Sequence, residues 1–304
     1  MDTPPPASPE PQRKVAGSTT AILLMVASTG LLSTAHVAAR WLTQEVHPFE
    51  AAFFRNVAAL LFITPLVLRH GRAAFRSKRP GMQAVRGISG VVTMLLWYMS
   101  LSVMPVAEAT AISFSVVIFT TIAAILFLGE RVGLRRWSAI LVGFLGMLII
   151  IRPGIANVGA GAGLVLACTC IWAISIITTK ILSRHDLSVV LVFYSSVYAV
   201  VFTAIPAALV WTTPTLPQLA VGLLMGVLAS TSMILGTEAM KRADASVVMP
   251  VDFTRLIWAA AIGFLAFGEF PDLWSWVGGT IIFASTLYIT LRESRARKAR
   301  SGSA

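Results

Sequence analysis

The chain reads ISFSVVIFTTIAAILFLGERVGLRRW over residues 112–137: an apolar run, a Gly-Glu pair, a short basic loop and a tryptophan. A helix that crosses a bilayer needs about 20 predominantly apolar residues. The run that ends at Gly129-Glu130 has that length, and another apolar run begins at Trp137. The segment therefore predicts a membrane helix that leaves the bilayer at a basic loop and is followed at once by another.

Similar apolar stretches lie on both sides of this segment. The 304-residue chain is 57% hydrophobic and 12% charged, and its mean hydropathy is +0.82. Apolar stretches of this length and number are typical of transmembrane proteins. The ten predicted spans are residues 17–40, 51–69, 84–104, 106–128, 134–151, 160–180, 188–211, 216–240, 245–268 and 273–291.

The basic residues predict how the spans are oriented. All but four of the 24 Lys and Arg residues lie in the two tails, in every second loop or at the span ends that border these loops, and the exceptions are Arg40, Arg55, Arg152 and Arg255. Cytoplasmic loops carry an excess of Lys and Arg. The expected fold is an all-α polytopic membrane protein with ten transmembrane helices and both termini in the cytoplasm.

The net charge of +11 has a simple explanation in such a protein. The basic residues are spread over many loops and do not cluster with aromatic residues on one soluble face, so they do not predict nucleic-acid binding. They are expected to face the anionic lipids of the inner leaflet of the bilayer.

The two halves of the chain resemble each other. A shift of 139 residues aligns Gly129-Glu130 with Gly268-Glu269, and Trp137 with Trp276. Each half holds five spans, and because five is odd, the second half enters the membrane in the opposite orientation. Inverted repeats are typical of secondary transporters, whose substrate site lies near the midplane between the repeats. The predicted organisation is a disordered cytoplasmic tail (1–16), a first five-helix repeat (17–152), a second five-helix repeat (160–292) and a basic cytoplasmic tail (293–304).

Residues 95–154 resemble the third to fifth helices of an EamA-type unit, from the ten-helix branch of the drug/metabolite transporter superfamily. The matching features are Pro105, the Leu128-Gly129-Glu130-Arg131 turn and Trp137. The second half departs from the pattern at Phe270, where the first half has Arg131, and at Pro250 inside its fourth span. The resemblance implies a carrier of amino acids, drugs or metabolites. Its first half is most similar to the branch of S-adenosylmethionine and riboflavin uptake carriers, so import of such a nucleoside- or vitamin-like metabolite is slightly preferred.

Asp252 and Arg255 are the ionisable residues expected deepest in the membrane. They are three residues apart on one helix, so their side chains share a face. They either form an internal ion pair or bind substrate, with Arg255 holding an anionic group and Asp252 releasing it or accepting a coupling proton. Pro250 frees the carbonyl of Ser246 and marks a predicted helix break, which is either an ordinary kink or part of the site.

A second set of ionisable residues is expected nearer the outer face of the membrane. Glu108, Arg55 and Arg40 should lie at similar depth, so a pair of Glu108 with Arg55 or with Arg40 is predicted as a gate or as a structural clamp. His36 lies one turn before Arg40. It is either a packing residue or a group that moves protons near neutral pH.

Polar and aromatic residues complete the predicted cavity. Ser113 aligns with Asp252 and Val116 with Arg255, and this asymmetry between the repeats suits an asymmetric substrate. Deep aromatic residues can stack on a flat or cationic ligand; the candidates are Trp97, Tyr98, Trp172, Tyr194 and Trp258. The predicted substrate-binding residues are Arg255, Asp252, Ser113, Phe114, Trp97 and Trp258.

Other functional classes fit the sequence less well. A membrane-embedded enzyme would need clustered ligands or catalytic groups, but the four His residues, at 36, 47, 70 and 185, are dispersed, so no catalytic residue, metal site or cofactor is predicted. No Walker A sequence occurs, which argues against transport driven by ATP. A channel usually shows a ring of identical charges or a carbonyl filter, and a dimeric channel stays open as an alternative, as does a carrier homodimer. The expected location is the cytoplasmic (inner) membrane of a bacterium. Export of amino acids or drugs remains the alternative direction.

Overall fold

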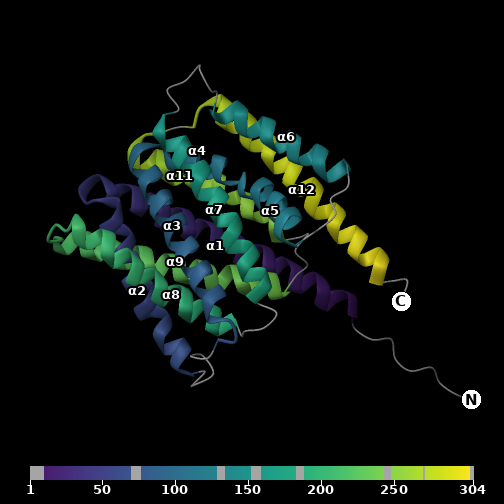
Figure 1. The fold of residues 1–304 in the computed structure, drawn as a ribbon. Coiled ribbons are helices and arrows are strands. Elements are labelled where there is room, and N and C mark those ends of the chain that lie inside the picture. The colour runs from purple at the N-terminus through teal and green to yellow at the C-terminus, as the bar shows by residue number, and fades with distance from the viewer. Residues whose placement is uncertain are drawn as a thin grey trace, which may run out of the picture.

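The computed structural model describes residues 10–69, 77–128, 134–151, 159–182, 188–242, 248–269 and 271–301. These residues form a bundle of helices, and none of them belongs to a strand (Figure 1). The helices are α1 (Glu10–Glu45), α2 (Pro48–Arg69), α3 (Pro80–Val103), α4 (Val106–Ser113), α5 (Val116–Leu128), α6 (Leu134–Ile151), α7 (Ala160–Leu182), α8 (Ser188–Leu209), α9 (Leu216–Arg242), the 3₁₀ helix η2 (Met249–Phe253), α11 (Thr254–Phe267) and α12 (Leu273–Ser301).

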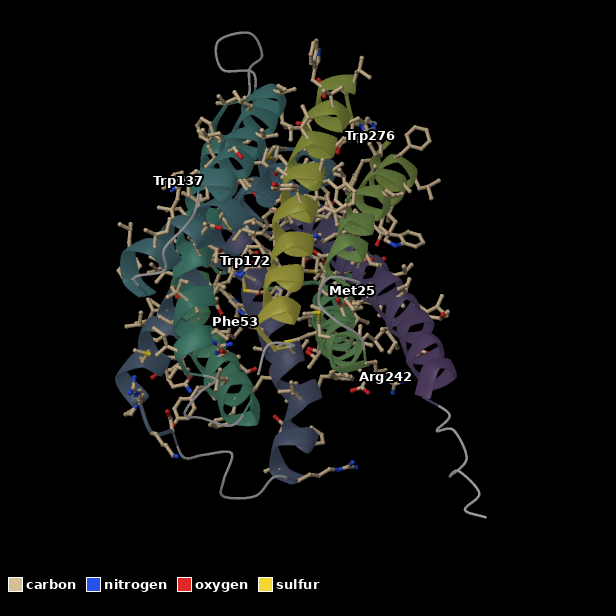
Figure 2. All side chains as sticks on the ribbon, turned by 90° about the vertical axis from the view of Figure 1, so that its right-hand side faces the viewer. Met25, Phe53, Trp137, Trp172, Arg242 and Trp276 are labelled. Carbon is tan, nitrogen blue, oxygen red and sulfur yellow. The ribbon has the colours of Figure 1, made fainter. Side chains whose placement is uncertain are left out.

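The outer surface of the bundle is apolar. Among the described residues, five helical segments are long and apolar enough to cross a membrane: Thr19–Glu45, Pro80–Val103, Val106–Phe127, Ala160–Thr179 and Leu216–Met240. Large side chains such as Leu126, Leu209 and Leu265 are more than 70% exposed, and carbon atoms dominate the outward-facing side chains in Figure 2. Apolar surface this extensive marks a protein that sits in lipid.

The terminal helices are longer than the predicted spans. α1 begins at Glu10, inside the segment predicted as a disordered tail, and α12 continues through the basic segment to Ser301. Both extensions are rich in Glu, Gln, Arg, Lys and Ala, which are strong helix formers. Figure 1 shows the start of α1 (purple) and the end of α12 (yellow) on the same side of the bundle.

The helix contacts follow the sequence repeat. In the 139-residue alignment α1 corresponds to α7, α2 to α8, α3 to α9 and α6 to α12. α1 packs along α9, and its counterpart α7 packs along α3, while α2 packs against α8 and α6 against α12. Figure 1 shows α6 and α12 side by side at one edge of the bundle. Exchanging the two repeats leaves this set of contacts unchanged, as a two-fold axis would.

The fourth span of each repeat is broken at equivalent places. The predicted span over residues 106–128 contains two helices, because α4 ends at Ser113 and α5 begins at Val116, although Val106–Phe127 as a whole is long and apolar enough to cross a membrane. Phe114 and Ser115 form a turn with i to i−3 hydrogen bonds, from Phe114 N–H to the Ala111 carbonyl (3.3 Å) and from Ser115 N–H to the Ile112 carbonyl (2.9 Å). In the second repeat the 3₁₀ helix η2, which contains Pro250, precedes α11 in the same way. Mid-helix 3₁₀ turns of this kind often mark hinges.

Hydrogen bonds at these breaks are also paired by the repeat. The Thr254 hydroxyl lies 2.7 Å from the Thr29 hydroxyl of α1. The counterpart of Thr254, Ser115, has its hydroxyl 3.4 Å from that of Thr169 in α7. Thr169 matches Thr29 when the first helices are aligned with a shift of 140, one residue more than the rest of the repeat. Each bond joins the broken helix of one repeat to the first helix of the other.

Phe114 and Phe253 meet where the broken helices face each other. They occupy equivalent positions in the two repeats, since 114 plus 139 is 253. Their rings are stacked, with centroids 4.1 Å apart and an interplanar angle of 13°. The contact of a residue with its own repeat counterpart places the pair on the pseudo-two-fold axis.

Glycine allows α9 to approach α2 closely. A Cβ atom at Gly226 would meet the Ala58 side chain and would lie 2.7 Å from the Arg55 carbonyl oxygen. Because both neighbours are parts of a packed helix, we expect Gly226→Ala to destabilise the protein by about 1–3 kcal/mol through overpacking. The measurement is the melting temperature of the purified protein in detergent.

Gly263→Ala is the matched control for that experiment. Gly263 is also helical and buried, but its added Cβ would meet no atom within 4 Å. Alanine is favoured over glycine in a helix by about 1 kcal/mol, so this variant should melt at or above the wild-type temperature. Equal melting temperatures for the two variants would contradict the close α2–α9 packing.

Candidate functional site

A cavity of about 270 Å³ lies at the centre of the bundle, between the two repeats. Its polar lining includes His36 from α1, Arg55 from α2, Ser113 from α4 and Arg255 from α11. α3 and α7 contribute the rings of Trp97, Tyr98 and Trp172. Trp172 lies at mid-height of the bundle in Figure 2. The cavity thus combines cationic groups with aromatic surfaces, from both halves of the chain.

Arg255 is held at the first turn of α11, directly after the helix break. Its side chain is 9% exposed, and its guanidinium group lies 3.9 Å from the Asp252 carboxylate. The same group lies 4.8 Å from the centre of the Phe114 ring, in cation–π geometry. Ser33 of α1 donates a hydrogen bond to the Arg255 carbonyl (3.0 Å). Three elements therefore fix this arginine at the point where the repeats meet.

Several buried polar atoms around the cavity have no hydrogen-bond partner within the described residues. They are Nδ1 of His36, Nε1 of Trp97, Oγ1 of Thr93 and Nε of Arg255. The rings of His36 and Trp97 also contact each other, with centroids 5.0 Å apart. Buried polar groups are nearly always hydrogen-bonded, so this cluster forms a surface that a polar ligand would satisfy.

Arg55 lies between the central cavity and a second cavity. Its guanidinium group donates to the Asn56 side-chain oxygen (2.9 Å) and lies 4.0 Å from the Met94 sulfur. The second cavity, of about 260 Å³, is lined by Arg55, Arg86 and hydroxyl groups that include those of Ser175 and Ser195. It shares Arg55, Gly90, Met94 and Ala229 with the central cavity.

A third cavity lies beside the second. It shares Ile63 with the second cavity and is also lined by Arg69, the last residue of α2. Lining residues of the three cavities therefore occur along α2 from Arg55 to Arg69.

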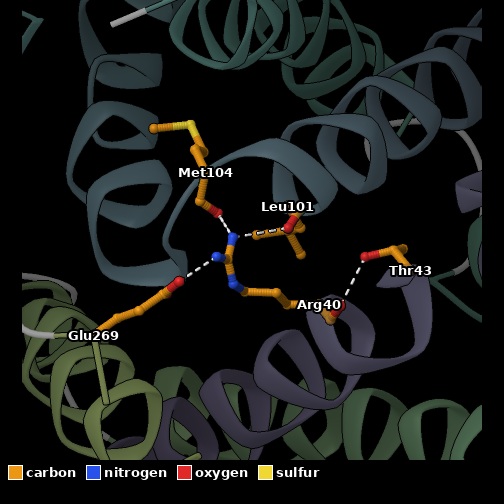
Figure 3. Close-up of polar contacts among 5 residues, drawn as sticks. All are labelled: Arg40, Thr43, Leu101, Met104 and Glu269. Atoms are coloured by element: carbon orange, nitrogen blue, oxygen red, sulfur yellow. Dashed lines mark hydrogen bonds and ion pairs between the residues drawn. The ribbon is translucent and has the colours of Figure 1, made fainter. Parts of the chain in front are cut away.

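Near the end of α1, Arg40 connects the two repeats outside the described lining of the central cavity (Figure 3). Arg40 donates to the carbonyls of Leu101 (3.1 Å) and Met104 and forms an ion pair with Glu269. Its guanidinium group also lies 5.3 Å from the centre of the Phe267 ring. The last carbonyls of a helix have no partner within it, so Arg40 caps α3 while it joins the first repeat to the second. We refer to Arg40, Leu101, Met104 and Glu269 as the Arg40 clamp.

The structure brings together some of the predicted site residues and leaves others apart. Arg255, Ser113, Trp97, Arg55 and His36 line the central cavity, whereas Trp258 is not among its described lining residues. Trp258 is 38% exposed, and its ring packs over Gly30. It lies three residues, almost one helical turn, beyond Arg255, so the two differ in depth along α11.

The remaining predicted residues lie next to the cavity or outside it. Asp252 and Phe114 contact Arg255 without belonging to the described lining. Glu108 is half-buried in the first turn of α4. Pro250 lies in the 3₁₀ helix η2. Glu130 and Arg131 of the repeated Gly-Glu turn lie outside the described residues.

Sequence reasoning missed two arginine arrangements. The partner of Arg40 in the clamp is Glu269, and the available signal was the Gly-Glu pair that recurs in both repeats. Arg86, near the start of the predicted span 84–104, has a guanidinium group that donates to the Thr179 hydroxyl (2.7 Å), the Leu191 carbonyl (2.8 Å) and the Ser195 hydroxyl. No local pattern at Arg86 distinguishes it from the loop arginines.

Comparison with known proteins matches almost the whole chain to one family. The model of the EamA-like transporter family matches residues 19–152 and again residues 159–291. A solved crystal structure covers 94% of this chain and 99% of its own, with a TM-score of 0.60 and 19% sequence identity, which shows a shared fold.

Characterised relatives carry transporter names. An S-adenosylmethionine uptake transporter of Rickettsia bellii is 32% identical over 86% of this chain and 89% of its own. A riboflavin transporter of Rhizobium johnstonii is 31% identical over 95% of both chains. The pseudopaline exporter CntI of Pseudomonas aeruginosa is 26% identical over 88% of this chain and 95% of its own. These matches confirm the resemblance drawn from residues 95–154.

Proposed function

This chain belongs to the EamA-like transporter family, and we propose that it carries a small ring-bearing organic metabolite across the cytoplasmic membrane by alternating access. In this proposal ten spans form two inverted five-helix repeats, with both termini in the cytoplasm. The observation that carries it is the central cavity, in which Arg255 and Arg55 face the rings of Trp97, Tyr98 and Trp172. Pockets with aromatic walls and a few fixed polar groups are typical of small-molecule sites.

The proposed substrate-binding residues are Arg255 and Asp252 with Ser113, Phe114 and Trp97. Arg255 and Trp97 would contact substrate directly, because both line the cavity and both hold an unpartnered buried nitrogen. Phe114 would position Arg255 through its ring. Trp258 has no support from the described cavity lining, and we do not include it.

The arrangement of cavities supports an inward-facing state. The Arg40 clamp joins the two repeats on the side where α1 ends, and the lining of the three adjoining cavities reaches Arg69, which adjoins the most basic loop. Basic loops are cytoplasmic. Alternation would open the clamp, and the broken helices with their symmetric hydrogen bonds to α1 and α7 are the proposed hinges.

Counterflow across proteoliposomes tests the carrier function. Vesicles are loaded with unlabelled S-adenosylmethionine or riboflavin, and uptake of the same labelled solute is followed. We expect saturable uptake of at least one of the two solutes, faster into loaded than into empty vesicles, because a carrier exchanges solute in each cycle. Uptake that neither saturates nor responds to internal solute would indicate a channel and contradict the proposal.

Import is the preferred direction, since relatives similar to this chain are named as uptake or riboflavin transporters. Export is the second candidate, because CntI is named as an exporter. A cell that lacks synthesis of the transported metabolite distinguishes the two: import restores its growth, whereas export lowers the internal concentration of the metabolite.

A further inference from the structure

Four arginines line the three adjoining cavities. Arg255 and Arg55 line the central cavity, Arg55 and Arg86 line the second, and Arg69 lines the third. None of the described residues that line these cavities is Asp or Glu. His36, the other titratable base in the lining, can add positive charge but no negative charge.

Most of this charge has no acidic partner within the described part of the chain. Asp252 offsets Arg255 across 3.9 Å. Arg55 and Arg86 are bound by neutral groups, which include the Asn56 side chain for Arg55 and Thr179 for Arg86. Charged groups at membrane depth are costly unless they face a partner or a water-filled cavity. Several arginines along the cavities without an acidic partner therefore indicate that their positive charge has a function.

We infer that the transported solute has two recognised parts, a planar ring and an anionic group, which is a carboxylate or a phosphate. Arg255 and Trp97 receive the two parts of the solute in the central cavity, and Arg55 accompanies the anionic group into the second cavity. Guanidinium groups suit this task because they bind carboxylate and phosphate with two parallel hydrogen bonds. This inference rests on the proposed carrier function and narrows its substrate class to solutes with such an anionic group; of the two counterflow solutes, S-adenosylmethionine has a carboxylate and riboflavin does not.

Arg55 lies where it could bind the anionic group of the solute as the solute moves between the central and the second cavity. It is shared by both inner cavities, and its backbone is fixed by the close approach of Gly226 to the Arg55 carbonyl. A solute anion could therefore pass from Arg255 to Arg86 without losing contact with a cation. Clefts lined by one sign of charge concentrate ions of the opposite sign.

The test compares how fast an anionic and a cationic reagent modify a cysteine placed between the central and the second cavity. Ala229 lines both of them. The variant Ala229→Cys is made with Cys168→Ser and Cys170→Ser, and serine at 168 can still donate to the Thr93 carbonyl as Cys168 does. The purified protein is reacted separately with sulfonatoethyl methanethiosulfonate, an anion, and trimethylammonioethyl methanethiosulfonate, a cation. The two rates are followed by intact-protein mass spectrometry.

The expected ratio of the anionic to the cationic rate is about tenfold above that of free 2-mercaptoethanol, in line with the concentration of counter-ions in charged clefts. Adding Arg55→Gln should lower the ratio several-fold. Adding Arg242→Gln should leave it unchanged, because Arg242 is exposed and pairs with Glu238 outside the cavities. Ala59→Cys, in the second cavity, gives an independent reporter if Ala229→Cys does not fold.

Three results would overturn the inference. They are a ratio no higher than that of the free thiol, a ratio that Arg55→Gln leaves unchanged, and the absence of reaction with either reagent. Each can occur while counterflow of a neutral or cationic solute is normal, and that combination leaves the carrier function intact. Conversely, high anion selectivity without counterflow of any solute would contradict the carrier and leave the anionic path in place.

Discussion

Arg255→Ala is expected to reduce counterflow to near background while the protein still folds and inserts into the membrane. Truncating one partner of a buried hydrogen-bonded charge pair costs about 2–5 kcal/mol, or roughly 30- to 4,000-fold in affinity. Arg255 faces the central cavity, stacks on Phe114 and keeps a buried Nε atom without a partner in the described residues. The measurement is counterflow in proteoliposomes with equal amounts of each variant.

Two further variants separate charge from geometry at this position. Arg255→Lys keeps the positive charge but loses the planar fork, so its activity should lie between wild type and alanine. Arg242→Ala is the control, because Arg242 is 47% exposed in an i,i+4 pair with Glu238. Elution as a single species in detergent and a melting temperature near that of wild type show that folding is retained. Normal counterflow by Arg255→Ala would remove Arg255 from the substrate site.

Reversing one charge of the Arg40 clamp is expected to lower counterflow about tenfold or more, and reversing both should restore part of it. Glu269→Arg places two guanidinium groups together, and like-charge contacts cost several kcal/mol. The double variant Arg40→Glu with Glu269→Arg restores the ion pair but deprives the Leu101 and Met104 carbonyls of their donor. Recovery should therefore be incomplete.

The exposed pair of Arg242 and Glu238 provides a matched charge reversal. Arg242 Nε lies 2.9 Å from Glu238 Oε1, and both side chains are more than a third exposed. Surface ion pairs contribute at most about 1 kcal/mol, so the double variant Arg242→Glu with Glu238→Arg should change counterflow by less than twofold. A double variant at the clamp that is no more active than Glu269→Arg alone would show that the two residues do not act together. It would also remove the support for a gate at this position.

The sequence was sufficient for the membrane class, the repeat and the family. These features are recorded in composition, in charge distribution and in the Gly-Glu and Trp positions that recur after 139 residues. Each of the ten predicted stretches coincides with a helical segment in the described part of the chain. The break at Phe114 and Ser115 was not predictable locally, because residues 106–128 contain neither Gly nor Pro. Tertiary contacts with Thr169 and Phe253 accompany it instead.

The candidate site was predictable in part, for a related reason. The depth of a residue in the membrane and its helix face can be read from the local sequence. Arg255, Trp97 and Ser113 were predicted to bind substrate on this basis, and all three line the central cavity. Contacts between the repeats are not local. Arg40 and Glu269 are 229 residues apart, and the choice of Glu269 over another acid depends on how the halves pack. Trp258 is not among the described lining residues of that cavity, and its depth was inferred without knowledge of the facing helix.

The stacked phenylalanines bear on how such a chain could arise by gene duplication. In an ancestral protein of one five-helix unit, positions 114 and 253 would be a single residue, and an antiparallel homodimer would stack that residue on its own copy. A single ancestral codon would then encode both rings that stack at the axis. Two further codons, one for the position of Thr29 and Thr169 and one for the position of Ser115 and Thr254, would encode both hydrogen bonds between the broken helices and the first helices. Fusion into one gene frees the copies to diverge. Arg255 opposite Val116, and Asp252 opposite Ser113, are differences that a homodimer could not encode.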